Sequence, residues 1–493
     1  MKGGISMNPA DERFVRKFCV NPRMTWKLPL GGMDCHLDFT TTERGTPYPV
    51  IVSSGKYSET VCDGRYRFHG ESSDAAVSRL LGHLMPLATY SLAITELDGA
   101  VGFVWLHGRS AAYVCLVADA NGCLSLVGHD GEGNEERIPT EYTFRPGIRL
   151  LAVPARGRVD VYLDRDGFPA FLHTFSFPVL DDVMRETFFM ETQACVFMSG
   201  TVTVSGAEVC MDSGLAQADI RPIRWETGEP LTENGHVWFT LTIRQQQGGY
   251  QGIVSWIPGT SEFALTGALF FDVGDGIWGN DVATSLLYDR NAKQWRLWYC
   301  SFTHGHILGH ASFAADPRCG VSVIDTTLVP MLTPEDPDTA FGGKSGDEDP
   351  DFYYDASTGM WTMAVCRVCR ENGKYRYFFF RSADPFDGYE FFRSGALGSE
   401  TGGSFVLSGD QRYFVCGNGF DRMSDYRVYD METDEPPRAL SADFPDGGFR
   451  GWGTLVPVPM GTRKKLYWLT FDRKLSSTNN WSYGNLYCFE AER

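Results

Sequence analysis

Short runs of alternating apolar and polar residues dominate the first part of the chain. Segments such as "VGFVWLHG", "AAYVCLVAD" and "IRLLAVPARGRVDVYLDRDG" follow one another at a spacing of roughly ten residues, with glycine or aspartate at the turns. Alternation with a period of two is typical of half-buried strands. The pattern predicts a β-sandwich over residues 23–218. Before it, "NPADERFVRKF" predicts a helical extension over residues 1–22, with Asp11 near the positive end of the helix.

A longer period begins near residue 219. Five polar turns each lead into an aromatic-rich strand: "TENGHVWFTLTIR", "YDRNAKQWRLWYCSF", "YDASTGMWTMAVC", "LSGDQRYFVCGNG" and "PMGTRKKLYWLTFD". Their aromatic centres recur about every 50 to 65 residues, which suits four-stranded units with variable loops. Such units bury their faces only by packing radially, so the period predicts a five-bladed β-propeller over residues 219–493. The terminal "NNWSYGNLYCFEA" would close its last blade. A second sandwich is the alternative, but sandwiches lack so regular a unit.

Composition agrees with an all-β chain of more than one domain. The 493 residues exceed what a single core usually holds. The chain has 54 glycines, 25 prolines and 14% aromatic residues, which favours many turns and pleated, half-buried surfaces. The expected fold class is therefore all-β, with an N-terminal β-sandwich of the jelly-roll type followed by a five-bladed β-propeller.

Charge and cysteine content limit the partners and the compartment. A formal net charge of −18 excludes nucleic acid and anionic membranes as natural partners and favours a neutral or cationic ligand. The sequence shows no export signal and no apolar run of the ~20 residues that cross a membrane, so we expect a cytoplasmic protein. Its 13 cysteines lie scattered in apolar runs, as free thiols in a reducing compartment would. We expect no cofactor and no metal.

Acidic residues stand just before three of the repeated hairpins. They are Asp281 in "WGND", Asp349 in "GDEDPDFYYD" and Glu400 in "SETG". Because the innermost strand of each blade lines the axis of a propeller, we expect these acids to meet there. Glycoside hydrolysis needs two carboxyl groups in opposite protonation states, and a third can raise the pKa of the acid. Glu226 and Glu229, before the first hairpin, are alternatives to Asp281 as the base.

The same motifs resemble a known family. The C-terminal part is similar to the five-bladed propeller glycoside hydrolases, which include arabinanases, β-xylosidases, invertases and levansucrases. In the invertase type, W-x-N-D carries the nucleophile, R-D-P the transition-state stabiliser, and a later glutamate is the acid. The resemblance implies Asp281 as base or nucleophile, Asp349 as stabiliser and pKa modulator, and Glu400 as general acid. Two positions depart from the family: Glu348 replaces the arginine, and Val282 follows "WGND", which leaves an inverting, arabinanase-like mechanism open.

Further residues near these acids are expected to contact a sugar. They are Trp278, Asn280, His304, Glu348, Arg450 and Trp452. Tryptophan rings stack on sugar rings, and polar side chains bond to hydroxyl groups. His304 and His306 stand two apart, but a third ligand for a metal is missing beside them.

Together these features predict a glycoside hydrolase that acts on furanoside-type (fructosyl or arabinosyl) or related oligosaccharides. A carboxylate separation of about 5 to 5.5 Å would indicate retention and about 6.5 to 9.5 Å inversion. A retaining enzyme could also transfer the sugar or form an anhydride. The alternative from another class is a non-catalytic carbohydrate-binding protein. The sandwich resembles laminin-G or concanavalin-like jelly rolls, and its role is left open between sugar binding, shaping the pocket rim and mediating a homo-oligomer.

Overall fold

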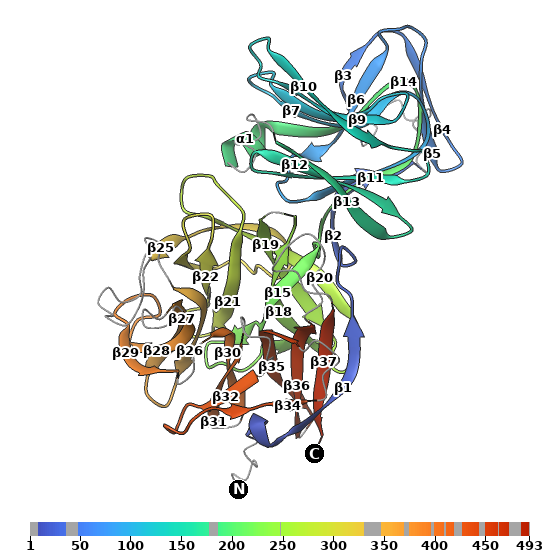
Figure 1. Cartoon of the computed structure of the whole chain (residues 1–493). Coiled ribbons are helices and arrows are strands. Elements are labelled where there is room, and N and C mark those ends of the chain that lie inside the picture. Colours follow the sequence, from blue (N-terminus) through green and yellow to red (C-terminus); the bar gives the residue numbers. More distant parts are fainter. Residues whose placement is uncertain are drawn as a thin grey trace. The chain divides into compact units, whose positions relative to one another are not determined.

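The chain folds into two compact, strand-rich units (Figure 1). One unit contains the residues up to Trp26, Ser213–Gly274 and the chain from Gly279 on, and the other contains Lys27–Asp212 with Asp275–Trp278. The computed structural model describes residues 8–35, 48–176, 186–246, 248–329, 347–368, 374–395, 399–408, 411–418, 426–442, 449–461, 463–472 and 485–492. In these ranges the helical elements are η1 (Pro9–Asp11) and α1 (Glu186–Glu191), and neither is long or apolar enough to cross a membrane.

Two long strands organise the sandwich unit. Strands β7 (Thr89–His107) and β14 (Thr192–Asp212) pair antiparallel along nearly their whole length, with register shifts around Val204. Each therefore takes part in two sheets. One sheet has the order β10-β9-β8-β7-β14-β6-β3, and the other runs through β13, β12, β11, β7, β14 and β2. The N-terminal β-sandwich that the sequence predicts is confirmed.

The remaining strands of this unit have the following bounds. They are β2 (Lys27–Met33), β3 (Val50–Ser54), β4 (Tyr57–Cys62), β5 (Arg65–Gly70), β6 (Ala76–His83), β8 (Tyr113–Ala118), β9 (Cys123–His129), β10 (Glu135–Thr143), β11 (Arg149–Ala155), β12 (Arg158–Arg165) and β13 (Phe168–Ser176). Aromatic side chains fill the space between the sheets, where Tyr90 meets Phe103 and Trp105 edge to face at 5.8 and 5.7 Å between ring centroids. Such contacts add to the burial of apolar area.

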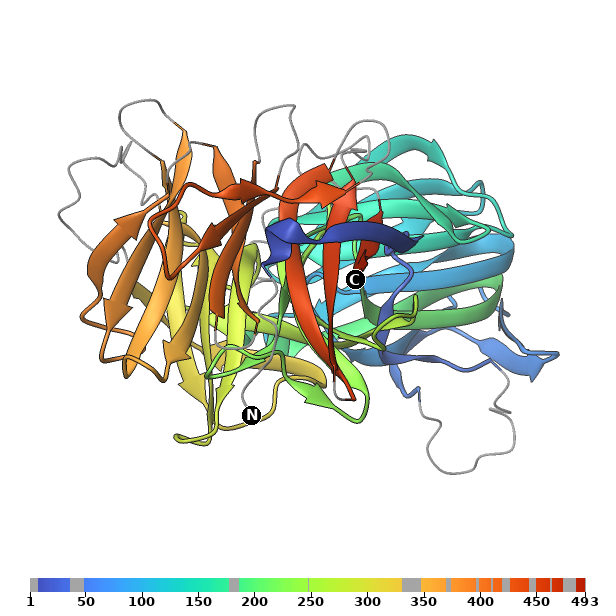
Figure 2. The ribbon, with the colours of Figure 1, turned by 90° about the horizontal axis from the view of Figure 1, so that it is seen from below.

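The other unit is a five-bladed propeller, as the sequence predicts (Figure 2). Its innermost strands are β15 (Ala216–Pro222), β21 (Asp281–Asp289), β26 (Glu348–Asp355), β30 (Glu400–Ser408) and β35 (Phe449–Met460). Each contacts the next along the chain, and β35 contacts β15, so the ring is closed. A closed ring removes long sheet edges, which would otherwise pair with other chains.

Each blade adds further strands to its inner strand, and in the second blade the short β16 pairs parallel with the inner strand itself. The first blade adds β17 (Thr232–Glu233), β18 (His236–Arg244), β19 (Gly249–Trp256), β20 (Phe263–Asp272) and β24 (Gly320–Asp325); the second β16 (Arg224–Trp225), β22 (Gln294–Ser301), β23 (Ile307–Phe313) and β25 (Thr327–Val329); the third β27 (Met360–Val368), β28 (Tyr375–Ser382) and β29 (Glu390–Ser394); the fourth β31 (Gln411–Asn418), β32 (Tyr426–Asp430) and β33 (Arg438–Ala439); the fifth β36 (Arg463–Asp472), β37 (Leu486–Glu492), β1 (Arg13–Val20) and β34 (Ser441–Ala442).

The N-terminal segment corrects the sequence-based prediction. Instead of a helix, strand β1 pairs antiparallel with β37, from Arg13 opposite Glu492 to Val20 opposite Leu486. Phe14 is buried, with its ring 5.7 Å from that of Trp468. The open edge of β37 offers a row of backbone partners, and this long-range pairing overrides the local helix signal. The sandwich, residues 27–212, is thus inserted between the first strand of the propeller and its first blade.

The inner strands of four blades share a β-bulge near their start, in which two residues stand opposite one residue of the neighbouring strand. The pairing register jumps from Ala218 to Arg221, from Val282 to Ser285, from Glu348 to Asp351 and from Thr401 to Ser404. The first bulged residue has a positive φ in every case: Asp219 (51°), Ala283 (54°), Asp349 (47°) and Gly402 (62°). Bulges of this kind turn a side chain out of the pleat, and left-handed non-glycine residues gather at functional sites.

A buried arginine stabilises two of these bulges. Nη1 of Arg221 donates hydrogen bonds to the backbone oxygens of Ala283 at 2.6 Å and Pro350 at 2.8 Å. Both carbonyls belong to bulged residues that the regular ladder leaves unpaired, so a side chain from the first blade satisfies them in the second and third. The bulges are therefore built into the centre of the ring.

Candidate active site

A pocket of about 130 Å³ lies at the bulged ends of the inner strands. The residues that line it are Ala218, Asp219, Arg244, Val282, Phe302, His306, Glu348, Asp349, Tyr375 and Thr401. Three of them are carboxylates: Asp219 comes from the first blade, and Glu348 and Asp349 come from the third. The bulges bring these acids together, because each turns a residue at the start of its strand toward the axis.

A chain of hydrogen bonds orients Asp219. The hydroxyl of Thr242 donates to its Oδ2 at 2.9 Å. That hydroxyl itself accepts from Nε2 of Gln251 at 2.9 Å and from the backbone N–H of Ala283 at 3.0 Å. Since two donors occupy its acceptor sites, its single hydrogen is directed at the carboxylate. Burial and the negative charge of Asp349 raise the pKa of Asp219 to about 6.

The carboxylate of Asp349 is held by the fourth blade. Its Oδ2 accepts a hydrogen bond from Oγ1 of Thr401 at 2.7 Å and another from the backbone N–H of Gly402 at 3.0 Å. The side chain is only 7% exposed, yet it lines the pocket. The two bonds fix its orientation across the boundary between blades, as a group that acts on a bound molecule requires.

Glu348 forms the third acidic wall of the pocket, together with an imidazole. Its Oε1 lies 2.7 Å from Nε2 of His306 and accepts a hydrogen bond of 2.6 Å from the Tyr375 hydroxyl. Sequence reasoning expected Glu348 to contact substrate, and it lies in the pocket; His306, rather than the expected His304, accompanies it.

The other two acids of "GDEDPD" have structural partners. Asp347 and Arg367 are fully buried and paired, with Nε 2.5 Å from Oδ1. Asp351 is likewise fully buried, pairs with the buried Arg224 and accepts a hydrogen bond from the backbone N–H of Phe405 at 2.6 Å. Crowding of charge in this stretch thus has two causes: two acids stabilise the centre of the ring, and two line the pocket.

Asp281 does not occupy the place expected of it. Counted from the bulges, Asp281 and Glu400 are equivalent, since each stands two residues before the first bulged position, whereas Asp349 is itself bulged. Asp281 is 3% exposed and does not line the pocket. The structure instead brings Asp219 of the first blade to the level of Asp349. In the second blade the residue equivalent to Asp219 and Asp349 is Ala283, whose methyl side chain can neither donate nor accept a proton.

Glu400 lies beside the pocket but is enclosed. It is fully buried, accepts from the backbone N–H of Tyr377 at 3.2 Å and from the Tyr429 hydroxyl, and a Cβ at Gly395 would collide with its Oε2. Burial raises its pKa to about 7. Its charge and that of Asp349 both raise the pKa of Cys366, so the two acids share one neighbourhood. Only its neighbour Thr401 lines the pocket.

Burial of Glu400 has a consequence for stability. Its pKa is about 7 in the fold and 4.5 as its ordinary value, so stability falls as pH rises between these values, because only the folded chain keeps the proton. We expect Glu400→Gln to unfold like the wild type at pH 4.5 and to be more stable at pH 8 by about 3 kcal/mol. Urea unfolding at both pH values measures this. An equal effect at both would contradict the burial of an ionisable group.

Other expected sugar contacts lie elsewhere. Trp278 belongs to the compact unit of the sandwich, where it is 2% exposed and its ring lies 5.3 Å from that of Phe189, and it does not line the pocket. Asn280 and His304 do not line the pocket. His304 is held near Ser301, with 3.0 Å between Nδ1 and Oγ.

The remaining predicted residues divide into two groups. Arg450 and Trp452 lie in strand β35, but their side chains fall outside the described part of the structure. Glu226 pairs with Arg290, and Glu229 is exposed; neither lines the pocket. Among the described residues, no group of three or more His, Cys, Asp or Glu side chains is arranged to hold a metal ion.

Sequence reasoning did not single out Asp219, although a signal exists. Asp219 and Arg221 in "DIRP" have the same spacing as Asp349 and Asp351 in "DPDF", and both pairs come before an aromatic hairpin. The shared spacing of two charged residues, repeated two blades apart, marks this level of the axis in the first and third blades. Arg244 and Tyr375 carry no comparable signal.

Comparisons with known proteins give likeness in fold only. No model of a protein family matches the chain, and no curated protein matches it in sequence. Levansucrase of Bacillus subtilis is 11% identical, over 57% of this chain and 86% of that one, with a TM-score of 0.41. An α-L-arabinanase of Penicillium chrysogenum, complexed with arabinobiose, is 7% identical over 90% and 98% of the two chains, with a TM-score of 0.34.

The sandwich also has a similar solved structure. The carbohydrate binding module CBM66 from Bacillus subtilis is 13% identical, over 32% of this chain and 91% of that one, with a TM-score of 0.24. The propeller enzymes belong to the group that the sequence motifs resemble. At these values the likeness describes folds and assigns no activity to this chain.

Proposed function

We propose that this protein is a glycoside hydrolase that removes one sugar from the end of a neutral oligosaccharide. The observation that carries the proposal is the pocket of about 130 Å³ lined by Asp219, Glu348 and Asp349. Its volume suits a single sugar ring. Three carboxylates facing one small space are costly for a structural site, because like charges repel there, but they match the needs of glycosidic cleavage.

Asp219 is the proposed base or nucleophile. Its backbone is held in a left-handed conformation, and Thr242 directs a hydrogen at Oδ2, which favours the ionised form. With a pKa of about 6 it is mostly ionised at neutral pH and still basic enough to accept a proton. This role replaces the one that the motif resemblance implies for Asp281.

Asp349 is the proposed stabiliser of the transition state. Its carboxylate is fixed by Thr401 and Gly402 before any substrate binds, so it need not reorganise when positive charge develops on the sugar ring. The negative charge of Asp349 also raises the pKa of Asp219, which is the effect expected of a pKa modulator.

Glu348 is the proposed proton donor. Its carboxyl group lines the pocket in contact with His306, and the hydroxyl of Tyr375 orients it. Glu400, which the motif resemblance implies as the acid, is enclosed by Tyr377 and Tyr429. A donor must come within hydrogen-bond distance of the leaving oxygen, so the lining residue is the better candidate.

The substrate class follows from charge and from the motifs. Three carboxylates and one arginine, Arg244, disfavour anionic sugars, and the motif resemblance favours fructosyl or arabinosyl residues. A panel of aryl glycosides, including fructofuranoside, arabinofuranoside and xyloside, tests the activity. We expect turnover of at least one, loss of it in Glu348→Gln, and retention in Glu400→Gln. Binding of oligosaccharide with a blank panel would support a carbohydrate-binding protein instead.

The pH dependence of kcat/KM should report Asp219. Because this carboxyl must be ionised to act, we expect kcat/KM to fall about tenfold per pH unit below an apparent pKa near 6. Initial rates between pH 4 and 8 measure this limb. A limb near the ordinary aspartate value of 3.8 would contradict the assignment, since it would mean that the titrating group is not the buried Asp219.

A further inference from the structure

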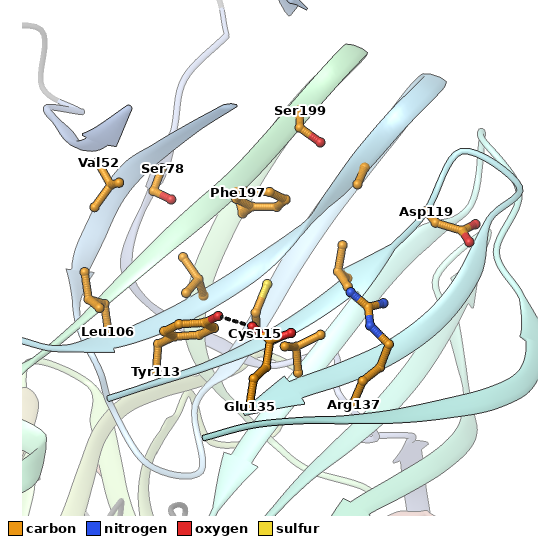
Figure 3. Close-up of a pocket in the computed structure, with 14 residues that line it drawn as sticks. Val52, Ser78, Leu106, Tyr113, Cys115, Asp119, Glu135, Arg137, Phe197 and Ser199 are labelled. Carbon is orange, nitrogen blue, oxygen red and sulfur yellow. Dashed lines mark hydrogen bonds between the residues drawn. The ribbon is translucent and has the colours of Figure 1, made fainter. Parts of the chain in front are cut away.

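The sandwich unit contains a second, larger pocket, of about 550 Å³ (Figure 3). It lies on the outer face of the sheet β10-β9-β8-β7-β14-β6-β3, and its lining comes from all seven strands. Val104, Val117, Val127 and Phe197 form its apolar middle. A hollow of this volume is typical of sites that take small molecules.

The apolar lining is unusual for the position. Along β8, Val114 and Leu116 are buried between the sheets, and the alternate residues Cys115 and Val117 lie on the opposite face, where they line the pocket and are only 8% and 6% exposed. The outer face of an antiparallel sheet is normally polar where it meets water. Here both faces of the strand are apolar, and the outer one is hollowed. Such a surface marks a binding site.

The charged groups of the pocket have hydrogen-bond partners, since the carboxylate of Asp119 accepts from the backbone N–H groups of Asn121 and Cys123. Tyr113 donates to Glu135 at 2.9 Å, and Figure 3 shows this pair near Arg137, across the hollow from Val52 and Phe197. Nη1 of Arg137 donates to Ser125 at 2.8 Å. These contacts engage Tyr113, Glu135 and Arg137, while the residues between them and Phe197 are mostly apolar.

The apolar lining and the charges of the pocket determine which kind of ligand can bind there. A sugar ring buried on valine and cysteine side chains would lose its hydrogen bonds to water without replacement, which costs free energy for each hydroxyl group. Two carboxylates, Asp119 and Glu135, oppose one guanidinium, Arg137, so an anionic headgroup is disfavoured. A neutral molecule with an apolar body is complementary to both features.

We propose that this pocket binds a neutral, lipophilic small molecule, with its apolar body on Val104, Val117 and Phe197 and its polar end toward Glu135 and Arg137. The site is independent of the proposed hydrolase function, because its lining residues all belong to the other compact unit. Loss of one site therefore leaves the other to be tested separately.

The full chain, titrated with the neutral dye Nile red, tests the proposal. We expect saturable binding of one dye per chain, with a rise in fluorescence. Decanol should displace the dye, whereas decanoate, with the same chain length and a negative charge, should be at least tenfold weaker. Equal displacement by decanol and decanoate would contradict the inference that Asp119 and Glu135 disfavour an anionic ligand.

A matched pair of variants locates the site. Val52 lines the pocket and is 51% exposed, and Val50 on the same strand is 38% exposed and does not line it. We expect Val52→Lys to weaken dye binding at least tenfold, because it places a charge in the apolar hollow, and Val50→Lys to change it less than twofold. Ser199→Trp, which fills the rim, should also abolish binding. Circular dichroism checks that each variant is folded.

Four results would overturn the proposal. They are absence of saturable binding to the wild type, equal binding by Val52→Lys and Val50→Lys, displacement of the dye by a fructo-oligosaccharide, and a wild-type dimer that Val52→Lys dissociates. The third would make the pocket a sugar site, and the fourth would make its occupant a second copy of the chain. Sedimentation of both variants distinguishes the last case.

Discussion

Asp219→Asn is expected to lower kcat on a cleavable glycoside by about four orders of magnitude, with the fold intact. The amide keeps the size of the side chain and can still accept from Thr242, but it can neither take a proton nor attack a sugar carbon. Because the substrate still fits the pocket, KM should change much less than kcat. Steady-state kinetics on the best substrate of the aryl glycoside panel measure both.

The matched control is Asp281→Asn. Asp281 is equally buried and belongs to the same kind of inner strand, but it does not line the pocket. We expect its kcat to stay within tenfold of the wild type. If Asp281→Asn abolished turnover and Asp219→Asn did not, the roles implied by the sequence motif would hold, and those drawn from the bulges would be wrong.

Asp351→Asn is expected to destabilise the propeller by about 3 to 5 kcal/mol. Asp351 and Arg224 are both fully buried and pair at the centre of the ring, where Phe405 donates its backbone N–H to the same carboxylate. Removing the negative charge leaves the guanidinium uncompensated in a medium of low dielectric. Guanidinium chloride unfolding followed by tryptophan fluorescence measures the loss.

Two controls separate charge from packing. The double variant Arg224→Met with Asp351→Leu removes both charges and should recover most of the loss, because no unpaired ion remains. Asp11→Asn breaks an exposed pair with Arg438 and should leave the unfolding midpoint unchanged. A double variant as unstable as the single one would show that the hydrogen bonds, and not the charges, matter at this place.

The five-bladed ring could be predicted because its signal is local and repeated. Trp295, Trp361, Tyr413 and Tyr467 all lie in the second strand of a blade, and all are buried. A blade must cover its face with large apolar side chains, so aromatic residues recur in the sequence once per blade. Because each inner strand comes just before such an aromatic strand in the sequence, its position can be predicted to within a few residues.

The level of each acid along its inner strand could not be predicted. Asp281 and Glu400 stand two residues before the first bulged residue of their strands, whereas Asp349 is itself bulged, and nothing in "WGND" or "SETG" reveals this difference. The bulges depend on contacts between blades, such as Arg221 with Ala283. Interactions between residues far apart in sequence decided which carboxylates reach the pocket.

Long-range pairing also explains the N-terminal error. The sequence predicts a helix in "NPADERFVRKF", but pairing with the free edge of β37, more than 460 residues away, makes residues 13–20 a strand. The apolar outer face of the sandwich is a similar case. "AAYVCLVA" predicts a buried strand, and the structure shows that Cys115 and Val117 on its second face belong to a hydrophobic cluster that also lines a pocket.

The most direct test is a crystal structure of Asp219→Asn with a bound trisaccharide of the type that the wild type cleaves. We expect the terminal ring in the pocket, with its anomeric carbon beside the side chain of residue 219, Asp349 along the ring and Glu348 within hydrogen-bond distance of the bridging oxygen. A sugar bound elsewhere, or a bridging oxygen directed at Glu400 with Glu348 turned away, would contradict this account.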